Sequence, residues 1–383
     1  MNRFRLSAIA LLLALGFSGA APLVAKPVAS RPVAPQPAAS KPIEIHAVVV
    51  TAFEIGADTG DTAGEFQAWA STIPTKIAFP AGDRPLRYDP ARGLLILSTG
   101  IGTNRAASAV MALGTDPRFD LTHAYWLIAA IAGVNPHTAS VGSAAWIGDI
   151  VDTDYGYAID PREIPKDWET GMYPRDRARP YQGPRGEAIY NLFPVNKGLR
   201  DWAYRLTSGM TLADGPILKR LRAGYGAYPA ALCPPFILRG DEATGQTFWH
   251  GTLLNEHVVK WIAYWTQRPD SFVMTGMEDS GVAFALATLG RMGRADADRL
   301  MVLRTGSNYT VQPAGKDAAQ SLEAEAMELS ALQPSLDAAF QLGSRVVNEL
   351  TGHWPRYRAS IPTASAPAPT PALAPSGGCA PAK

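Results

Sequence analysis

The sequence has 383 residues, 47% hydrophobic and 18% charged, which is enough to bury a sizeable core as one large domain or two small ones. Its 35 Lys and Arg residues balance 34 Asp and Glu residues, so with a net charge of +1 no overall field attracts the chain to nucleic acid or to an anionic membrane surface. We therefore expect no nucleic-acid partner and a small neutral ligand instead.

The first 25 residues have the pattern of a secretory signal peptide. Arg3 and Arg5 precede an apolar stretch at residues 6–17, and small side chains at 19–21 and at 23–25 provide two alternative cleavage sites. We expect an exported, periplasmic bacterial protein that is soluble after the signal peptide is removed. A retained anchor helix is the alternative, but the apolar stretch is short for a span of the bilayer.

Segments rich in Pro and Ala flank the expected folded region. Residues 26–42 are predicted to form an extended spacer and residues 363–383 a disordered tail, which leaves residues 43–362 as one elaborated domain. The apolar run at residues 124–134 is too short to cross a membrane and fits a buried strand. A single disulfide between Cys233 and Cys379 is compatible with export, whereas two cysteines cannot form a disulfide framework.

Four strands and one helix are predicted in the first half of the domain. The apolar runs at residues 45–51, 93–99, 124–131 and 145–153 are typical of strands, and the small side chains at 104–113 are typical of a helix. Each strand is apolar along nearly its whole length, which indicates a sheet that is buried on both faces. The sequence therefore predicts a layered α/β fold.

Residues 155–190 interrupt this pattern with many Pro, Gly, Arg and Tyr residues, and we interpret them as a long surface insertion. Helices and strands then alternate again. The expected helices are 196–208, 217–223, 252–266 and 280–292, and the expected strands are 236–239, 271–275 and 300–304. A long helix at 317–350, broken at Pro334, is expected to close the domain.

Polar side chains follow several of the predicted strands. Glu54 follows the first strand, residues 100–105 the second, residues 277–279 the strand at 271–275, and residues 306–308 the last strand. Ligands of open α/β sheets lie beyond the carboxyl ends of the strands, so we expect these loops to form one pocket.

Four segments, in this order, resemble the nucleoside phosphorylase and nucleosidase superfamily. Residues 99–107 are similar to its Ser-Gly-Ile-Gly-Lys segment, 132–151 to its Ala-Gly-Gly-Leu and Val-Gly-Asp-Ile-Val segments, 277–280 to Met-Glu-Ala, and 303–308 to Val-Arg-x-Ile-Ser-Asp. The variants Met-Glu-Asp-Ser-Gly and Leu-Arg-Thr-Gly-Ser-Asn-Tyr, together with the signal peptide, resemble the bacterial and fungal purine nucleoside permease family. The resemblance implies a nucleoside-phosphorylase-like layered sandwich, with helices flanking a mixed central sheet.

The resemblance also implies roles for two of the segments. Glu278 matches the carboxylate that binds the ribose hydroxyls, with Met277 under the sugar; the helix start favours an ionised carboxylate, although acidic residues are ordinary there. Asn308 matches the residue that contacts the purine. An amide there can donate and accept, and Asn in place of Asp implies a preference for 6-oxopurines, hence inosine or guanosine. The alternative interpretation of 306–309 is a simple turn.

The sequence also contains candidates for the residue that activates water and for the aromatic residue that stacks on the purine. Glu54 matches the position from which hydrolytic members of the superfamily activate water, and a solvated loop glutamate is its alternative interpretation. A purine stacks on aromatic faces. Of the available loop aromatics Tyr155, Tyr157, Phe248 and Trp249, we take Tyr155 and Trp249 as the base-binding candidates.

The phosphate site of the superfamily's phosphorylases is poorly matched. Residues 51–53 are Thr-Ala-Phe where those enzymes have a Gly loop, and Ala130 stands in place of a hydroxyl side chain. Gly102, Thr103 and Arg105 remain candidate anion ligands because a helix N-terminus offers free amides. Phosphorolysis is therefore not favoured. The His and Cys residues do not cluster as metal ligands do, and we expect no metal and no cofactor.

Two functions are compatible with these residues. The first is purine nucleoside binding for uptake, which the family name implies, with the ligand passed to a separate membrane transporter. The second is cleavage of the N-glycosidic bond, by water with Glu54 as the base. In the superfamily a neighbouring subunit often contributes residues to the binding site, so we also expect a homo-oligomer.

Overall fold

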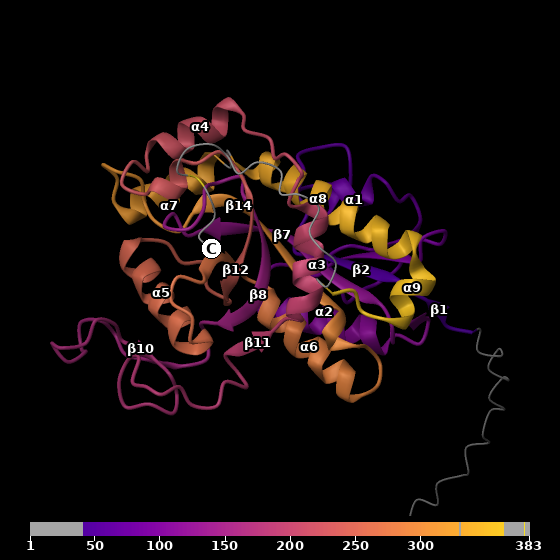
Figure 1. The fold of residues 1–383 in the computed structure, drawn as a ribbon, viewed down its shortest axis with the longest axis horizontal. Helices are drawn as coiled ribbons and strands as arrows, with labels where there is room; N and C mark the ends of the chain where they lie inside the picture. Colours follow the sequence, from indigo (N-terminus) through magenta and orange to yellow (C-terminus); the bar gives the residue numbers. More distant parts are fainter. Residues whose placement is uncertain (1–40, 329–330, 364–378, 380–383) are drawn as a thin grey trace, which may run out of the picture. The chain divides into compact units, whose positions relative to one another are not determined.

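The computed structural model describes residues 41–328, 331–363 and 379 (Figure 1). The predicted signal peptide, nearly all of the predicted spacer and most of the predicted tail lie outside the described residues. Within the part of the chain that the structure describes, no helix combines the length and the apolar character needed to cross a membrane.

Ten of the described strands form one large mixed sheet. Its central strands are β2 (Ala47–Thr51), β5 (Leu94–Ser98), β7 (Tyr125–Val134), β8 (Ala144–Asp152), β12 (Ile237–Thr244), β13 (Phe272–Gly276) and β14 (Leu300–Tyr309). Its outer strands are β3 (Lys76–Ile77), β4 (Leu86–Asp89) and β11 (Leu192–Pro194). Parallel pairs such as β2–β7 and β14–β7 stand beside antiparallel pairs such as β14–β8 and β13–β7. The expected mixed central sheet is confirmed.

Strand β14 connects two parts of this sheet. It pairs with β7 on one side and β8 on the other, while β8, β12, β13 and β7 also pair in sequence. These pairings close a ring of five strands. The carboxyl ends of β7, β13 and β14 are thereby brought together, next to the end of β2.

Both faces of the sheet are covered, because the apolar strands present side chains in both directions. In β2, Val48 and Val50 belong to one apolar cluster and Ala47 and Val49 to another. The first cluster includes α2 (Thr103–Thr115) and α6 (Asp279–Arg291), which pack against each other. The second includes α1 (Gln67–Ala70), α8 (Leu332–Gly352) and α9 (Trp354–Ala359), with α3 (Lys197–Thr207).

The remaining described elements lie around this core (Figure 1). They are α4 (Pro216–Ala223), α5 (Thr252–Thr266), α7 (Ala318–Glu328), the 3-10 turns η1 (Pro229–Leu232) and η2 (Ala297–Arg299), the strand pair β1 (Ile43–Glu44) and β6 (Phe119–Asp120), and the strand pair β9 (Tyr157–Ala158) and β10 (Met172–Tyr173). The second pair lies in the expected insertion. A disulfide joins Cys233, directly after η1, to Cys379.

Several expected element bounds were wrong. The strand expected at 236–239 continues to Thr244, and the one expected at 124–131 continues to Val134. The last strand does not end at residue 304 but continues to Tyr309, because β7 pairs with it as far as Val134, with a shift of register between Gly306 and Asn308. The C-terminal helix is not broken at Pro334. It is interrupted before Leu332, and Pro334 lies in the first turn of α8, where its missing N–H leaves no helical hydrogen bond unmade.

Candidate functional site

A cavity of about 590 Å³ opens where β2, β7, β13 and β14 end. The lining residues from strands and strand ends are Ala52, Phe53, Ile131, Ala132, Gly133, Thr275, Gly276, Arg304, Ser307, Asn308 and Tyr309. Those from helices and loops are Glu65, Ile101, Val141, Arg220, Leu221, Gly224, Tyr225, Phe248, Met277, Glu278, Pro313, Lys316, Ser321, Leu322, Ala324 and Leu332. Its size falls within the roughly 300–1,000 Å³ of small-molecule sites.

Glu278 is held against the cavity wall by fixed donors. It immediately precedes α6, and its side chain is 6% exposed. Gly102 N donates to its Oε1 at 3.1 Å, and Arg304 Nη2 donates to its Oε2 at 2.8 Å. A carboxylate held from two sides keeps one orientation and retains acceptor capacity for a ligand hydroxyl.

Arg304 organises a fully buried group of acids. Its guanidinium pairs with Asp279 as well as with Glu278, and its Nη1 donates to Ile131 O at 2.7 Å. Burial opposes the charge of Arg304, but the Asp279, Glu278 and Glu242 carboxyl groups raise its pKa well above the ordinary value. The cation is therefore fixed in place, and it neutralises part of the negative charge beside the cavity.

Glu242 is the third acid of this group, and its Oε2 lies 3.7 Å from Arg304 Nε. Burial, followed by the neighbouring Asp279 charge, raises the pKa of Glu242 well above its ordinary value. Among the described residues, neither oxygen of Glu242 accepts a hydrogen bond, so Arg304 is the positive group that offsets its charge.

Glu65 is a further acid with a raised pKa, and it lines the cavity. The carboxyl group is buried, and it accepts from Ala52 N at 2.6 Å and from Ile131 N at 2.8 Å. Burial and the nearby Glu278 charge raise the pKa of Glu65 to about 8, against the opposing effects of Arg304 and the two amide bonds. Glu65 therefore carries a proton at neutral pH, and a carboxyl group in this state can donate or take up a proton within the cavity.

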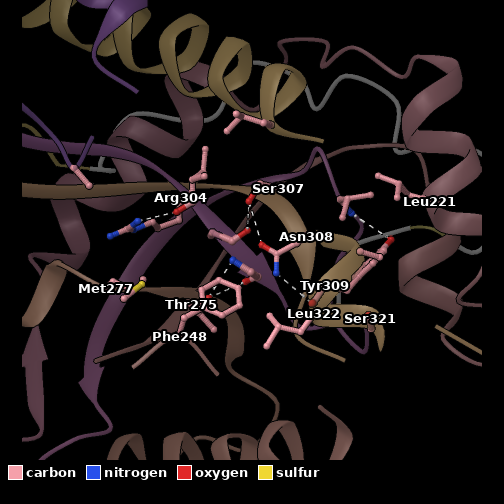
Figure 2. A pocket seen from close by; sticks show the side chains of 18 of the residues that line it. Leu221, Phe248, Thr275, Met277, Arg304, Ser307, Asn308, Tyr309, Ser321 and Leu322 are labelled. Carbon is pink, nitrogen blue, oxygen red and sulfur yellow. Dashed lines mark hydrogen bonds between the residues drawn. The ribbon is translucent and has the colours of Figure 1, made fainter. Parts of the chain in front are cut away.

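Asn308 lies further along β14 than Arg304 (Figure 2). Ser307 Oγ donates to its Oδ1 at 3.1 Å, and its Nδ2 donates to Tyr309 O at 3.3 Å. Gly133 of the neighbouring strand β7 lies opposite Asn308. A Cβ added at Gly133 would lie 2.8 Å from Thr275 Oγ1 and 3.6 Å from Asn308 Nδ2. A side chain at residue 133 would thus occupy space beside the amide.

Three of the expected site residues line this one cavity, namely Met277, Glu278 and Asn308. Glu54 does not line it. Its carboxylate accepts from Gly64 N at 2.5 Å and from Ile55 N at 3.0 Å, and so it fixes the loop that follows β2.

The two aromatic candidates also lie elsewhere. Tyr155 is in the insertion, with its ring centroid 4.7 Å from that of Tyr190, and Trp249 packs against the apolar cluster around α5. Phe248, one residue before Trp249, lines the cavity instead and is 50% exposed.

The three candidate anion ligands lie at the start of α2, but each has different surroundings. The Gly102 amide is used by Glu278, and Thr103 Oγ1 donates to Gln246 Oε1 at 2.9 Å. Arg105 lines a separate hollow of about 360 Å³ together with Asp83. The structure therefore does not bring these three residues together around one anion position.

Sequence reasoning missed Glu65 and gave Arg304 no role. Arg304 lies within residues 303–308, which resemble a segment of the superfamily, and that resemblance was the usable signal. Glu65 had no local signal, because it lies eleven residues beyond Glu54. Among the described residues, no group of three or more His, Cys, Asp and Glu side chains is arranged to hold a metal ion.

Comparison with known proteins places these observations in a family. The family description "Purine nucleoside permease (NUP)" matches residues 44–362. A probable purine nucleoside permease of Schizosaccharomyces pombe is 30% identical over 267 residues, which cover 67% of this chain and 76% of that protein. The purine nucleoside permease of Candida albicans is 27% identical over 266 residues, which cover 67% of this chain and 64% of that protein.

Solved structures with low sequence identity are also similar. Futalosine hydrolase of Helicobacter pylori is 13% identical, with a TM-score of 0.47, over 80% of this chain and 98% of that chain. A 5′-methylthioadenosine/S-adenosylhomocysteine nucleosidase of Colwellia psychrerythraea, in complex with adenine, is 18% identical, with a TM-score of 0.45, over 78% of this chain and 95% of that chain. The family description alone covers nearly the whole described domain, and on that ground the chain belongs to the purine nucleoside permease family.

Proposed function

We propose that the cavity binds a purine nucleoside and that this binding serves nucleoside uptake. The observation that carries the proposal is the Glu278 carboxylate, which is buried on the cavity wall and oriented by Arg304 and the Gly102 amide. Fixed carboxylate oxygens are suited to ribose hydroxyls, and a charge-assisted hydrogen bond of this kind contributes about 1.5–3 kcal/mol. Met277 supplies apolar surface next to the carboxylate.

The base is proposed to lie at Asn308. The side-chain amide offers both a donor and an acceptor, which suits the O6 acceptor and the N1–H donor of inosine or guanosine. Phe248, half exposed in the cavity wall, replaces Tyr155 and Trp249 as the aromatic candidate for stacking.

The role in uptake rests on the family and on the N-terminal sequence. Relatives in the family carry the name permease. The signal pattern of the first 25 residues supports export to the periplasm, where the protein would capture the nucleoside and deliver it to a separate membrane transporter.

A second function, cleavage of the N-glycosidic bond, is favoured by Glu65. In this reaction water adds to C1′ of the sugar, the bond from C1′ to the base nitrogen breaks, and the base leaves with a proton. Glu65 carries a proton at neutral pH and lines the cavity, which suits a group that exchanges protons with water or with the leaving base. A protonated Glu65 is suited to donate to the leaving base, whereas the sequence suggested Glu54 as the base that activates water.

One experiment separates the two functions. The purified protein is incubated with inosine, with and without phosphate, while hypoxanthine release and bound inosine are both measured. Bound inosine without hypoxanthine supports binding for uptake. Hypoxanthine release that needs no phosphate and is lost in Glu65→Gln, but not in Glu54→Gln, supports hydrolysis. Absence of both binding and release refutes the proposed function.

A further inference from the structure

Two cationic side chains line the cavity and have no carboxylate partner among the residues that the structure describes. Arg220 is in α4, and Lys316 follows the end of β14. Within the described residues, neither side chain makes an ion pair or a hydrogen bond. The contrast is with Arg222, also in α4, which pairs with Asp214 through two bonds of 2.6 and 3.0 Å.

Both cations lie at the end of the cavity that is remote from Glu278. The segment after β14 contacts the end of α4, because Ala314 N donates to Gly224 O at 3.0 Å and the Tyr225 and Tyr309 rings have centroids 3.9 Å apart. From Arg304 to Asn308, β14 spans four residues, or about 13 Å. Figure 2 shows Leu221, the neighbour of Arg220, on the far side of Asn308 from Arg304.

The cavity therefore has a polarity along its length. The buried carboxyl groups are at one end, the Asn308 amide is in the middle, and the two cations are at the other end, among apolar side chains such as Leu221, Pro313 and Leu322. A neutral nucleoside bound at Glu278 and Asn308 leaves the cationic end unused. Arg220 and Lys316 are both exposed, so an anion at this end would stay partly in contact with water and would gain mainly from the two neighbouring positive charges.

We propose that the natural ligand is a purine nucleoside whose base carries an anionic group, a carboxylate or a phosphate, bound by Arg220 and Lys316. This inference rests on the proposed function, because that function sets the sugar at Glu278 and the base at Asn308. The six-membered ring of the purine then points away from the sugar, and a substituent on it extends toward the cations. The guanidinium matches the two oxygens of a carboxylate, and the lysine adds a second charge.

The test compares each acid with its own methyl ester, which has nearly the same size but no charge. The probes are guanosine with a 2-carboxyethyl group on its 2-amino nitrogen, adenosine with the same group on its 6-amino nitrogen, the methyl ester of each, and a 2-phosphonoethyl version of each. Calorimetry should show at least one acid binding about tenfold more tightly than its own ester, with the carboxylate and phosphonate arms identifying the preferred anion.

The variants assign this preference to the two cations. In the double variant Arg220→Gln, Lys316→Gln the acid and its ester should bind equally, and inosine should bind as it does to the unaltered protein. Lys219→Gln is the matched control, because Lys219 is an exposed cation of the same helix that does not line the cavity. It should keep the full preference.

The outcomes separate this inference from the proposed function. If inosine binds but neither acid is preferred over its ester, the inference is overturned and the proposed function stands. If inosine 5′-monophosphate gains affinity through Arg220 and Lys316, the anion belongs on the sugar and the inference is again overturned. If no nucleoside or derivative binds, both fail together.

Discussion

Replacing Arg304 by Met tests whether one buried cation holds the acid group of the site together. The guanidinium is 2% exposed and pairs with Glu278 at 2.8 Å and with Asp279. Methionine keeps much of the side-chain volume but leaves these carboxylates buried without a positive partner. Removing one member of a buried ion pair costs about 3–5 kcal/mol, so we expect the free energy of unfolding to fall by about 4 kcal/mol at pH 7.5.

The loss of unfolding free energy caused by Arg304→Met should depend on pH. A buried carboxylate without its cation binds a proton, so between pH 5.5 and 7.5 the folded variant holds a proton that the unfolded chain does not. Stability then decreases as pH rises, by about 1.4 kcal/mol per pH unit and per proton. Over these two units the difference is about 3 kcal/mol, which reduces the cost to about 1 kcal/mol at pH 5.5.

Urea unfolding at the two pH values measures this difference. Arg299→Met is the matched control, because Arg299 is equally buried but its carboxylate partner, Asp296, is 38% exposed, and its other bonds are to the Tyr357 and Arg358 carbonyls. Its cost should be the same at both pH values. A pH-independent cost for Arg304→Met, or one under about 1 kcal/mol at pH 7.5, refutes the account of the acid group.

Three further predictions concern packing, the disulfide and the acid of the cavity. Gly281→Ala should lower the free energy of unfolding by about 3 kcal/mol, because the new Cβ would lie 2.1 Å from the Thr103 carbonyl oxygen of α2. Gly290→Ala in the same helix is the control, because the atom nearest to its new Cβ is 3.7 Å away. In the same urea assay, Gly290→Ala should leave the free energy of unfolding unchanged or raise it by under about 1 kcal/mol. Reducing the Cys233–Cys379 bond should lower stability by about 2–5 kcal/mol, and a reductant should have no effect on the variant with Ser at both positions. Because the pKa of Glu65 is about 8 and its neutral form is the proposed proton donor to the leaving base, the rate of hypoxanthine release should be level up to about pH 7 and decrease above pH 8, whereas Glu54→Gln should keep the same profile.

The buried strands could be predicted from the sequence because each is apolar on both faces. β2 and β5 lie within one or two residues of the ranges expected from composition alone. The end of β14 could not be predicted, since Gly306, Ser307 and Asn308 are turn-forming residues. Pairing with β7 overrides that local preference, and the irregular register at Gly306 is the cost of continuing the strand.

Site residues that directly follow a strand could be predicted from the sequence, whereas a site residue that a folded-back loop brings to the cavity could not. Met277 and Glu278 follow β13 directly and line the cavity. Glu54 likewise follows β2, but it does not line the cavity. The Glu65 N–H group donates to Phe53 O at 3.0 Å, so the loop folds back onto the end of the strand. This contact brings the Glu65 carboxyl group to the cavity. A contact of this kind depends on the path of the whole loop, and no local sequence pattern records it.

Calorimetric titration of inosine into the unaltered protein and into Glu278→Gln tests the central claim most directly, with Glu54→Gln as the control whose carboxylate lies outside the cavity. The amide introduced by Glu278→Gln would face the Arg304 and Gly102 donors with one N–H group and lose the charge, so we expect affinity to fall about tenfold to 150-fold while the fold is retained. Glu54→Gln should bind inosine normally. Equal affinities of all three proteins for inosine would contradict the assignment of the sugar to Glu278.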